Sequence, residues 1–153
     1  MIKRRIFIGA AGAMVVLAGM MAMTGCKEEP VPEVDFLKCK IEGVAWEANK
    51  SLSANMDQGI LILNGVNAAN DTLRFLMQDH QPGTWPVKNI QNIIVYLKNG
   101  KTYVPLNSAD AALTITSHDA AAKVVKGTFY YTADDGAGNW LVITGGEFRC
   151  TYP

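Results

Sequence analysis

The sequence is poor in the residue types on which most metal and acid/base sites depend. It contains only two histidines, His80 and His118, and three cysteines among its 153 residues. Transition-metal sites usually need three or more ligands on rigid elements, and these histidines lie in separate predicted loops. Their neighbours Asp79 and Asp119 are typical of turns, where an aspartate accepts hydrogen bonds from backbone amides. We therefore expect no metal site and no cofactor.

Concentrated positive charge is also missing from most of the chain. Three of the fourteen Lys and Arg residues, Lys3, Arg4 and Arg5, lie at the extreme N-terminus, which leaves eleven basic against fourteen acidic side chains beyond it. Nucleic-acid binding needs several basic side chains along one face to meet the phosphates. A mildly acidic chain without such a cluster excludes nucleic acid as a partner.

Recognisable catalytic patterns are absent from the sequence as well. It has no Ser/His/Asp motif and no paired carboxylates in a familiar frame, and a nucleophilic cysteine would need a base and a cationic setting nearby. Asp134 and Asp135 lie among glycines, but their loop lacks the ligand pattern and final Glu of a calcium loop, which favours a plain hairpin turn. We therefore expect no enzyme.

The first 25 residues have the pattern of a signal peptide. A basic start is followed by residues 6–23, which carry no charge, and then by the small residues Thr24 and Gly25 before Cys26. The apolar run is long enough to span a bilayer, so an uncleaved transmembrane helix is the alternative. Arg4-Arg5 also resembles a twin-arginine export motif, but we favour an ordinary basic n-region with two adjacent arginines, because no cofactor site that would need loading in the cytoplasm is expected. We expect a signal helix over residues 1–25.

The segment Met23-Thr24-Gly25-Cys26 resembles the lipobox of bacterial lipoproteins. The resemblance implies that residues 1–25 are removed and that Cys26 carries a diacylglyceryl thioether and an acyl chain on its amino group. Two or more chains give stable anchoring, so the expected partner is a membrane that the protein sits on through lipid. The expected location is the cell envelope, in the form of an outer-membrane lipoprotein that faces the periplasm or the cell surface.

Residues 26–35 are predicted to be the lipidated cysteine and an extended tether. Two prolines and four acidic residues leave this segment little to bury. The pair Glu28-Glu29 resembles the signal that sends some lipoproteins of Bacteroidetes-type bacteria to the outer face of the outer membrane. A generic spacer is the alternative.

Residues 36–153 are predicted to form one all-β domain. Apolar residues alternate with polar ones, and Gly, Asn and Asp separate the runs, as is typical of strands and tight turns. Asn99-Gly100 between two such runs predicts a hairpin. We expect about eight to ten strands in a single antiparallel β-sandwich, or alternatively a flattened barrel. The clearest strands are expected at residues 37–41, 60–63, 73–77, 93–97, 102–104, 113–115, 125–131, 140–144 and 147–152.

The turn glycines and aromatic residues of this domain resemble a family of small, uncharacterised lipoproteins of Bacteroidetes-type bacteria. The resemblance implies the fold and the location and transfers no catalytic residue. The residues that carry it are Phe36, Cys39, Ile41, Gly43 and Trp46, then Gly83-Thr84-Trp85, Ile115-Thr116, Gly127-Thr128-Phe129 and Ile143-Thr144 with Gly146 and Phe148.

Cys39 and Cys150 lie near the two ends of the domain, each on the apolar face of a predicted strand. The terminal strands of a sandwich often lie together, and two such thiols in an exported protein are commonly joined. We expect a disulfide between them, with two separate buried thiols as the alternative.

The aromatic residues Trp140 and Tyr130 fall on the faces opposite Leu141 and Phe129, so we expect them in solvent. Exposed aromatic side chains can form a binding hot spot, although core packing is the alternative. The expected function is a non-catalytic, membrane-anchored binding module for a glycan or an envelope protein. A small-molecule carrier with an apolar cavity and an envelope hydrolase are the rival hypotheses.

Overall fold

The computed structural model describes residues 33–87, 92–105 and 111–153. In these ranges the chain forms eleven strands, and none of the described residues belongs to a helix long and apolar enough to cross a membrane. The strands are β1 (Phe36–Ile41), β2 (Val44–Glu47), β3 (Ser51–Asp57), β4 (Ile60–Val66), β5 (Thr72–Met77), β6 (Gly83–Pro86), β7 (Asn92–Lys98), β8 (Lys101–Pro105), β9 (Ala112–Asp119), β10 (Val124–Asp134) and β11 (Trp140–Thr151).

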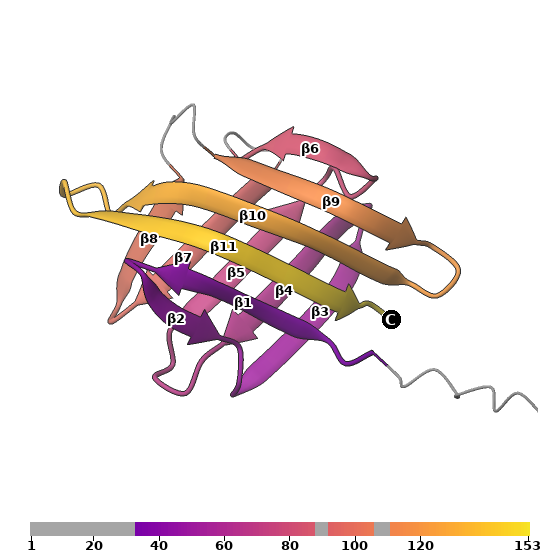
Figure 1. Ribbon diagram of the computed structural model, residues 1–153, viewed down its shortest axis with the longest axis horizontal. Helices are drawn as coiled ribbons and strands as arrows, with labels where there is room; N and C mark the ends of the chain where they lie inside the picture. Colours follow the sequence, from indigo (N-terminus) through magenta and orange to yellow (C-terminus); the bar gives the residue numbers. More distant parts are fainter. Residues whose placement is uncertain (1–32, 88–91, 106–110) are drawn as a thin grey trace, which may run out of the picture. The chain divides into compact units, whose positions relative to one another are not determined.

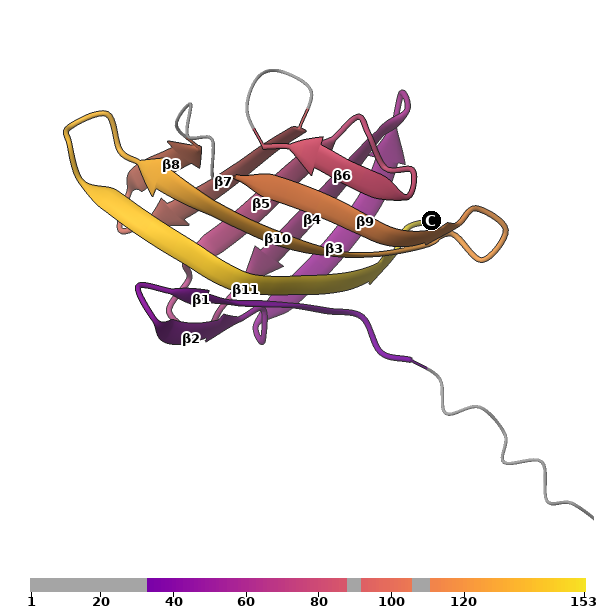
Figure 2. The same cartoon turned by 45° about the horizontal axis from the view of Figure 1, so that its top comes forward.

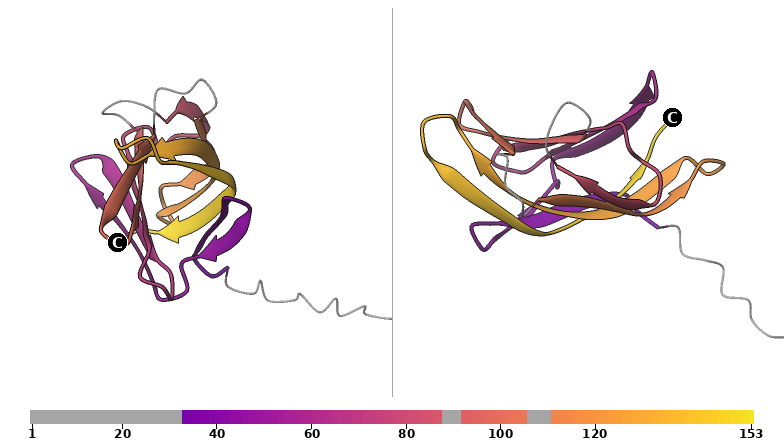
Figure 3. Two further views of the ribbon diagram at one scale, coloured as in Figure 1. Left: turned by 90° about the vertical axis from the view of Figure 1, so that its left-hand side faces the viewer. Right: turned by 90° about the horizontal axis from the view of Figure 1, so that it is seen from above.

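All the strands belong to one antiparallel sheet. Its main path runs β2-β1-β11-β10-β8-β7-β5-β4-β3, while β9 pairs with β10 and β6 pairs with β9. Figure 1 shows β10 and β11 crossing in front of β3, β4, β5 and β7, and Figure 2 shows them in front of β3, β4 and β5 after a turn of 45°. The view from above in Figure 3 shows that the sheet curls until its two halves face each other as a half-barrel. The predicted all-β antiparallel fold is therefore confirmed.

The core fills the space between the two halves of the sheet. In β5, Leu73, Phe75 and Met77 have no exposed surface, as their alternation with polar residues predicts. The ring of Phe75 packs edge-on against Phe129 of β10, with 4.9 Å between centroids, and also contacts Phe148 of β11 at 5.7 Å. Such aromatic pairs stabilise a fold by about 0.5–1.5 kcal/mol beyond the area they bury. These contacts join the half of the sheet that contains β5 to the half that contains β10 and β11.

A bulge in β11 helps the sheet to curl. Gly145 has a φ of +57°, and the register of β11 with both neighbours shifts by one residue there. A glycine in the left-handed region is typical of a bulge that bends its strand. The next residue, Gly146, packs against the core. A Cβ added to it would lie 2.6 Å from atoms of the Phe129 ring. Residues 140–144 and 147–152, predicted as separate strands, are therefore joined in one bent strand, β11, which ends at Thr151.

The predicted Cys39–Cys150 disulfide is wrong, although its topological basis is right. The first and last strands, β1 and β11, are neighbours. Phe36 lies opposite Arg149, however, so Cys150 is level with position 35, four residues from Cys39. That offset is about 13 Å along the strand, beyond the roughly 7 Å between Cα atoms that a disulfide can span. Both thiols are buried and free.

The compact unit begins at Glu33, three residues before the predicted start of the domain at position 36. The predicted signal helix over residues 1–25, the lipidation site Cys26 and most of the tether lie outside the described residues.

Candidate functional site

Four large apolar side chains lie in solvent on the outer face of neighbouring strands. They are Val104 of β8, Tyr130 of β10, and Trp140 and Val142 of β11, with exposed fractions of 42%, 49%, 57% and 47%. We call them the outer row. In most soluble domains exposed apolar residues are scattered singly, so several of them along one face mark a candidate contact surface.

The strand register places the outer row on one face. Asp134 lies opposite Trp140 on one side and opposite Val104 on the other, and Thr132 lies opposite Val142. Side chains directly opposite in paired strands share a face of the sheet. Tyr130 is four residues before Asp134 in the regular alternation of β10, which is about 13 Å along the strand.

Trp140 and Tyr130 are therefore ends of a row and not a stacked pair. Both were predicted to be exposed, and the structure places both in solvent. Sequence reasoning missed Val142 and Val104, which extend the row. Alternation about the inward-facing Leu141 was a signal that could have found Val142.

The hairpin beside Trp140 is held by the carboxylate of Asp135. It accepts hydrogen bonds from the backbone N–H groups of Ala137 and Asn139 at 2.9 and 3.1 Å, and from the Asn139 side chain at 2.6 Å. Lys101 of β8 adds an ion pair at 3.1 Å. The Asn139 hydrogen bond is the largest of the causes that hold the pKa of Asp135 below its ordinary value. The Asp135 carboxylate thus stabilises the turn between β10 and β11, in agreement with the predicted hairpin turn.

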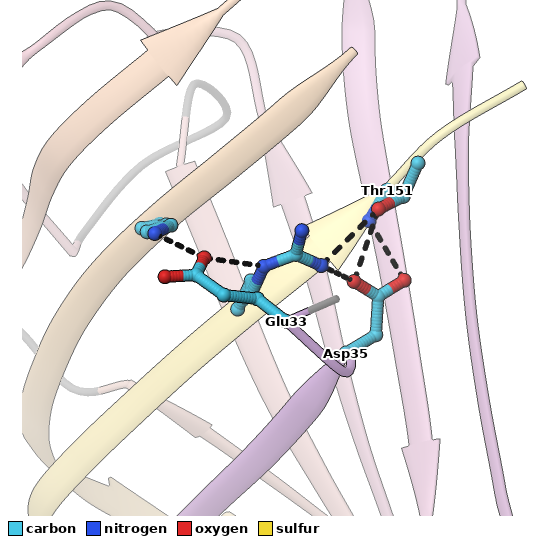
Figure 4. Close-up of polar contacts among 5 residues, drawn as sticks. Glu33, Asp35 and Thr151 are labelled. Atoms are coloured by element: carbon cyan, nitrogen blue, oxygen red, sulfur yellow. Dashed lines mark hydrogen bonds and ion pairs between the residues drawn. The ribbon is translucent and has the colours of Figure 1, made fainter. Parts of the chain in front are cut away.

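At the other end of β11 an ion-pair cluster fixes the chain where it enters the domain (Figure 4). Arg149 donates to Glu33 at 3.0 Å and also pairs with Asp35. Asp35 in turn accepts hydrogen bonds from the backbone N–H and the hydroxyl of Thr151, at 2.9 and 3.0 Å. Lys126 also pairs with Glu33, and its hydrogen bond is the largest cause that lowers the pKa of Glu33. We call these five residues the entry clamp.

The entry clamp and Trp140 lie at opposite ends of β11. Asp35 contacts Thr151 at the end of β11, whereas Trp140 begins that strand, eleven positions earlier. Figure 1 shows the described chain entering at one end of the long axis and the β10–β11 hairpin at the other. The point where the chain enters the domain therefore leaves the surface around Trp140 uncovered.

The two histidines come together, which their positions in the sequence did not predict. The rings of His80 and His118 are 5.1 Å apart, and His118 Nε2 lies 2.8 Å from the hydroxyl of Tyr152. Burial, and secondarily His80, lowers the pKa of His118. No group of three or more His, Cys, Asp or Glu residues able to hold a metal ion occurs within the described ranges.

The two buried thiols are chemically quiet in this environment. Burial raises the pKa of both Cys39 and Cys150 to about 12. The thiolate is the nucleophilic form of cysteine, so neither side chain is activated at neutral pH.

A pocket of about 240 Å³ opens between the β1–β2 hairpin, the β4–β5 loop and β7. Its polar lining includes Glu42, Trp46, Asp71, Tyr96 and Lys98. These residues are spread over 57 positions of the chain, from 42 to 98. No short motif in the sequence could have revealed them as a group.

One protein-family model matches the chain. It is described as a domain of unknown function (DUF6252) and covers residues 35–150. No curated protein and no solved structure matches.

Proposed function

Because the chain belongs to the DUF6252 family, whose description assigns no activity, we propose from its geometry that it is a non-catalytic binding module anchored to the cell envelope. The observation that carries the proposal is the outer row, in which Val104, Tyr130, Trp140 and Val142 stay in solvent on one sheet face. Trp and Tyr are enriched among the few residues that supply most of the energy of protein interfaces. The module would use this face for recognition.

An envelope protein fits the outer row better than a glycan. Trp140 and Tyr130 could stack on sugar rings, but Val104 and Val142 have no ring face to offer and gain most from apolar side chains of a partner. A glycan strand remains the second possible class of partner.

The entry clamp supports the same proposal. Glu33 and Asp35 fasten the start of the domain to Arg149 and Thr151, at the far end of β11 from Trp140. A lipid on Cys26 would hold the domain through this end. Trp140 would then lie at the other end of β11 from the anchored start of the domain, where other components of the envelope could reach it.

The rival hypotheses receive less support. A carrier would need an apolar cavity in the core, and the rings of Phe75, Phe129 and Phe148 pack against one another there. For a hydrolase, His118 is the most promising base, but its Nε2 already lies at hydrogen-bond distance from the hydroxyl of Tyr152. We therefore favour binding over both.

Site-specific photo-crosslinking in intact cells tests the binding proposal. A benzophenone amino acid at position 140 should give one discrete adduct after irradiation, whereas the same probe at the exposed Ser53 of β3 should give none. Val142→Asp should abolish the adduct, because it replaces an apolar contact by a second carboxylate near Asp134, which lies between Trp140 and Val104. Equal crosslinking at positions 140 and 53 would contradict the proposal. A heterogeneous adduct that an envelope glycosidase removes would show that the partner is a glycan and not a protein.

Export and lipidation belong to the same proposal, as does the likeness to small lipoproteins of Bacteroidetes-type bacteria. Support comes from Met23-Thr24-Gly25-Cys26 after an uncharged run. Replacing Cys26 by Ala should remove the acyl mass and leave an unprocessed precursor. Identical mass and membrane fractionation of the wild type and the variant would exclude a lipid anchor.

A further inference from the structure

A carboxylate lies in the middle of the outer row. Asp134 of β10 is directly opposite Trp140 of β11 on one side and Val104 of β8 on the other, and its side chain faces away from the core. Side chains directly opposite in paired strands have Cβ atoms about 4.5–5.5 Å apart. A partner that covers Trp140 and Val104 therefore also covers Asp134.

No cation among the described residues neutralises this carboxylate. Asp134 Oδ1 accepts the backbone N–H of Gly136, as an aspartate in a turn commonly does. Lys101 lies on the neighbouring strand β8, but its ammonium group pairs with Asp135 at 3.1 Å. Within the described ranges Asp134 takes part in no ion pair, so only solvent compensates its negative charge.

A second carboxylate borders the row. Glu42, in the β1–β2 turn, accepts a hydrogen bond from the backbone N–H of Val142, and its own N–H donates to the Val142 carbonyl oxygen at 2.9 Å. Glu42 is exposed and, like Asp134, has no ion-pair partner in the described part of the chain. The outer row thus contains one uncompensated acid and borders on another, which favours a basic partner surface.

The position of Asp134 also defines which cation fits. Burying an unpaired charge is strongly unfavourable, so a partner must place a cation against this carboxylate. A guanidinium binds a carboxylate through two parallel N–H bonds and also stacks on an aromatic face, which Trp140 supplies here. Lysine offers a point charge and no plane to stack. Arginine is therefore the side chain that uses both Asp134 and Trp140.

We propose that the partner of the outer row is a protein that places an arginine against Asp134, with the guanidinium stacked on Trp140 and apolar side chains against Val104 and Val142. The inference rests on the function proposed for this face and narrows its partner to a protein with a basic contact surface. Glu42 lies at the rim of the contact, where charge mainly speeds association. One guanidinium compensates one buried acid, so the second carboxylate of Val142→Asp would stay unpaired.

Photo-crosslinking in intact cells tests this inference, with the benzophenone in place of Tyr130 so that Asp134 and Trp140 are unchanged. Asp134→Asn keeps an oxygen for the Gly136 N–H but removes the charge, and it should lower the yield of the protein adduct about tenfold or more. Asp57→Asn on β3 is the matched control and should not change the yield. Trp140→Leu should lower the yield more than Trp140→Phe, because only phenylalanine keeps a ring face for the guanidinium.

Charge exchange identifies the arginine. Peptide mapping of the adduct gives the partner segment at the contact, and each arginine of that segment is changed to glutamate. Asp134→Arg should abolish the adduct with the unchanged partner, and one of the partner variants should restore it. The melting temperatures of the full-length variants in detergent should stay within a few degrees of the wild type, because surface substitutions usually cost little.

The outcomes separate this inference from the binding proposal. An unchanged adduct yield in Asp134→Asn, or a loss in Asp134→Arg that no partner variant restores, would overturn the arginine contact and leave the binding proposal standing. An adduct with a glycan would overturn it in the same way. Absence of any adduct when Asp134 and Trp140 are intact would overturn the inference together with the binding proposal on which it rests.

Discussion

The hydroxyl of Tyr96 donates a hydrogen bond of 2.9 Å to the carboxylate of Asp71, 25 positions earlier in the chain. Tyr96 is 1% exposed and Asp71 8%, so the pair links β7 to the start of the β5 strand inside the domain. Burial, and then this hydrogen bond, raises the pKa of Tyr96. The phenol therefore stays protonated and remains a donor.

Removal of this hydrogen bond should destabilise the fold. Tyr96→Phe leaves a buried carboxylate with one donor fewer, and we expect the free energy of unfolding to fall by about 1–3 kcal/mol. Urea denaturation measures the change. Tyr103→Phe is the matched control, because its ring packs beside Tyr96 at 6.1 Å without a hydrogen bond to Asp71. An equal decrease in the free energy of unfolding in both variants would show that the hydrogen bond to Asp71 adds no stability of its own.

Gly146 should tolerate no larger side chain. A Cβ at this position would lie 2.6 Å from the ring of Phe129, which is itself buried, so the core would have to shift. We expect Gly146→Ala to lower the free energy of unfolding by about 1–3 kcal/mol. Thr128→Ala, an exposed change on β10, should stay within about 0.5 kcal/mol. Thermal or urea unfolding compares the two, and a neutral Gly146→Ala would contradict the described packing.

The thiols of Cys39 and Cys150 should be free but protected in the native domain. Because burial raises the pKa of each to about 12, neither should react with an alkylating reagent at pH 8 until the domain unfolds. Mass spectrometry should then find both labelled in denaturant without prior reduction. A reductant should not change the melting temperature. A lower melting temperature after reduction would show that the two cysteines form a disulfide and would contradict the strand register.

The Asp135 hairpin should contribute a pH-dependent part of the stability. The pKa of Asp135 is lowered in the folded state, so its contribution is complete above the ordinary value of 3.8 and is lost as the pH falls through the lower, folded-state value. Asp135→Asn should therefore be less stable than the wild type at pH 7, with a difference that shrinks below pH 3.8. Urea unfolding across this range measures it. A difference that is constant with pH would exclude the carboxylate charge as the cause.

Alternation along the sequence predicted which way many side chains face. It placed Leu37 and Ile41 in the core and Tyr130 and Trp140 in solvent, as the structure shows. The Asn99-Gly100 turn joins β7 to β8 as expected, with both residues at positive φ. These features depend on neighbours in the chain, and so a single sequence contains them.

Features that depend on distant residues could not be predicted in the same way. Alternation fixes the face of a residue but not its position along a strand, which is why Cys39 and Cys150 were paired wrongly. The strand β3 (Ser51–Asp57) was missed because Asn and Asp have low β propensity, and its pairing with β4 stabilises it instead. The pocket around Asp71 and Trp46 also forms only when separate strands meet.

Oxidative footprinting of tryptophan tests the central claim most directly, because the chain contains its own controls. In the purified protein, Trp140 should oxidise fastest, Trp85 more slowly and Trp46 least, in the order of their exposure. In intact cell envelopes, Trp140 should be protected several-fold while Trp85 keeps its rate, because a partner covers the outer row. Equal oxidation of Trp140 in purified protein and in envelopes would contradict the account of this domain as a binding module that uses that face.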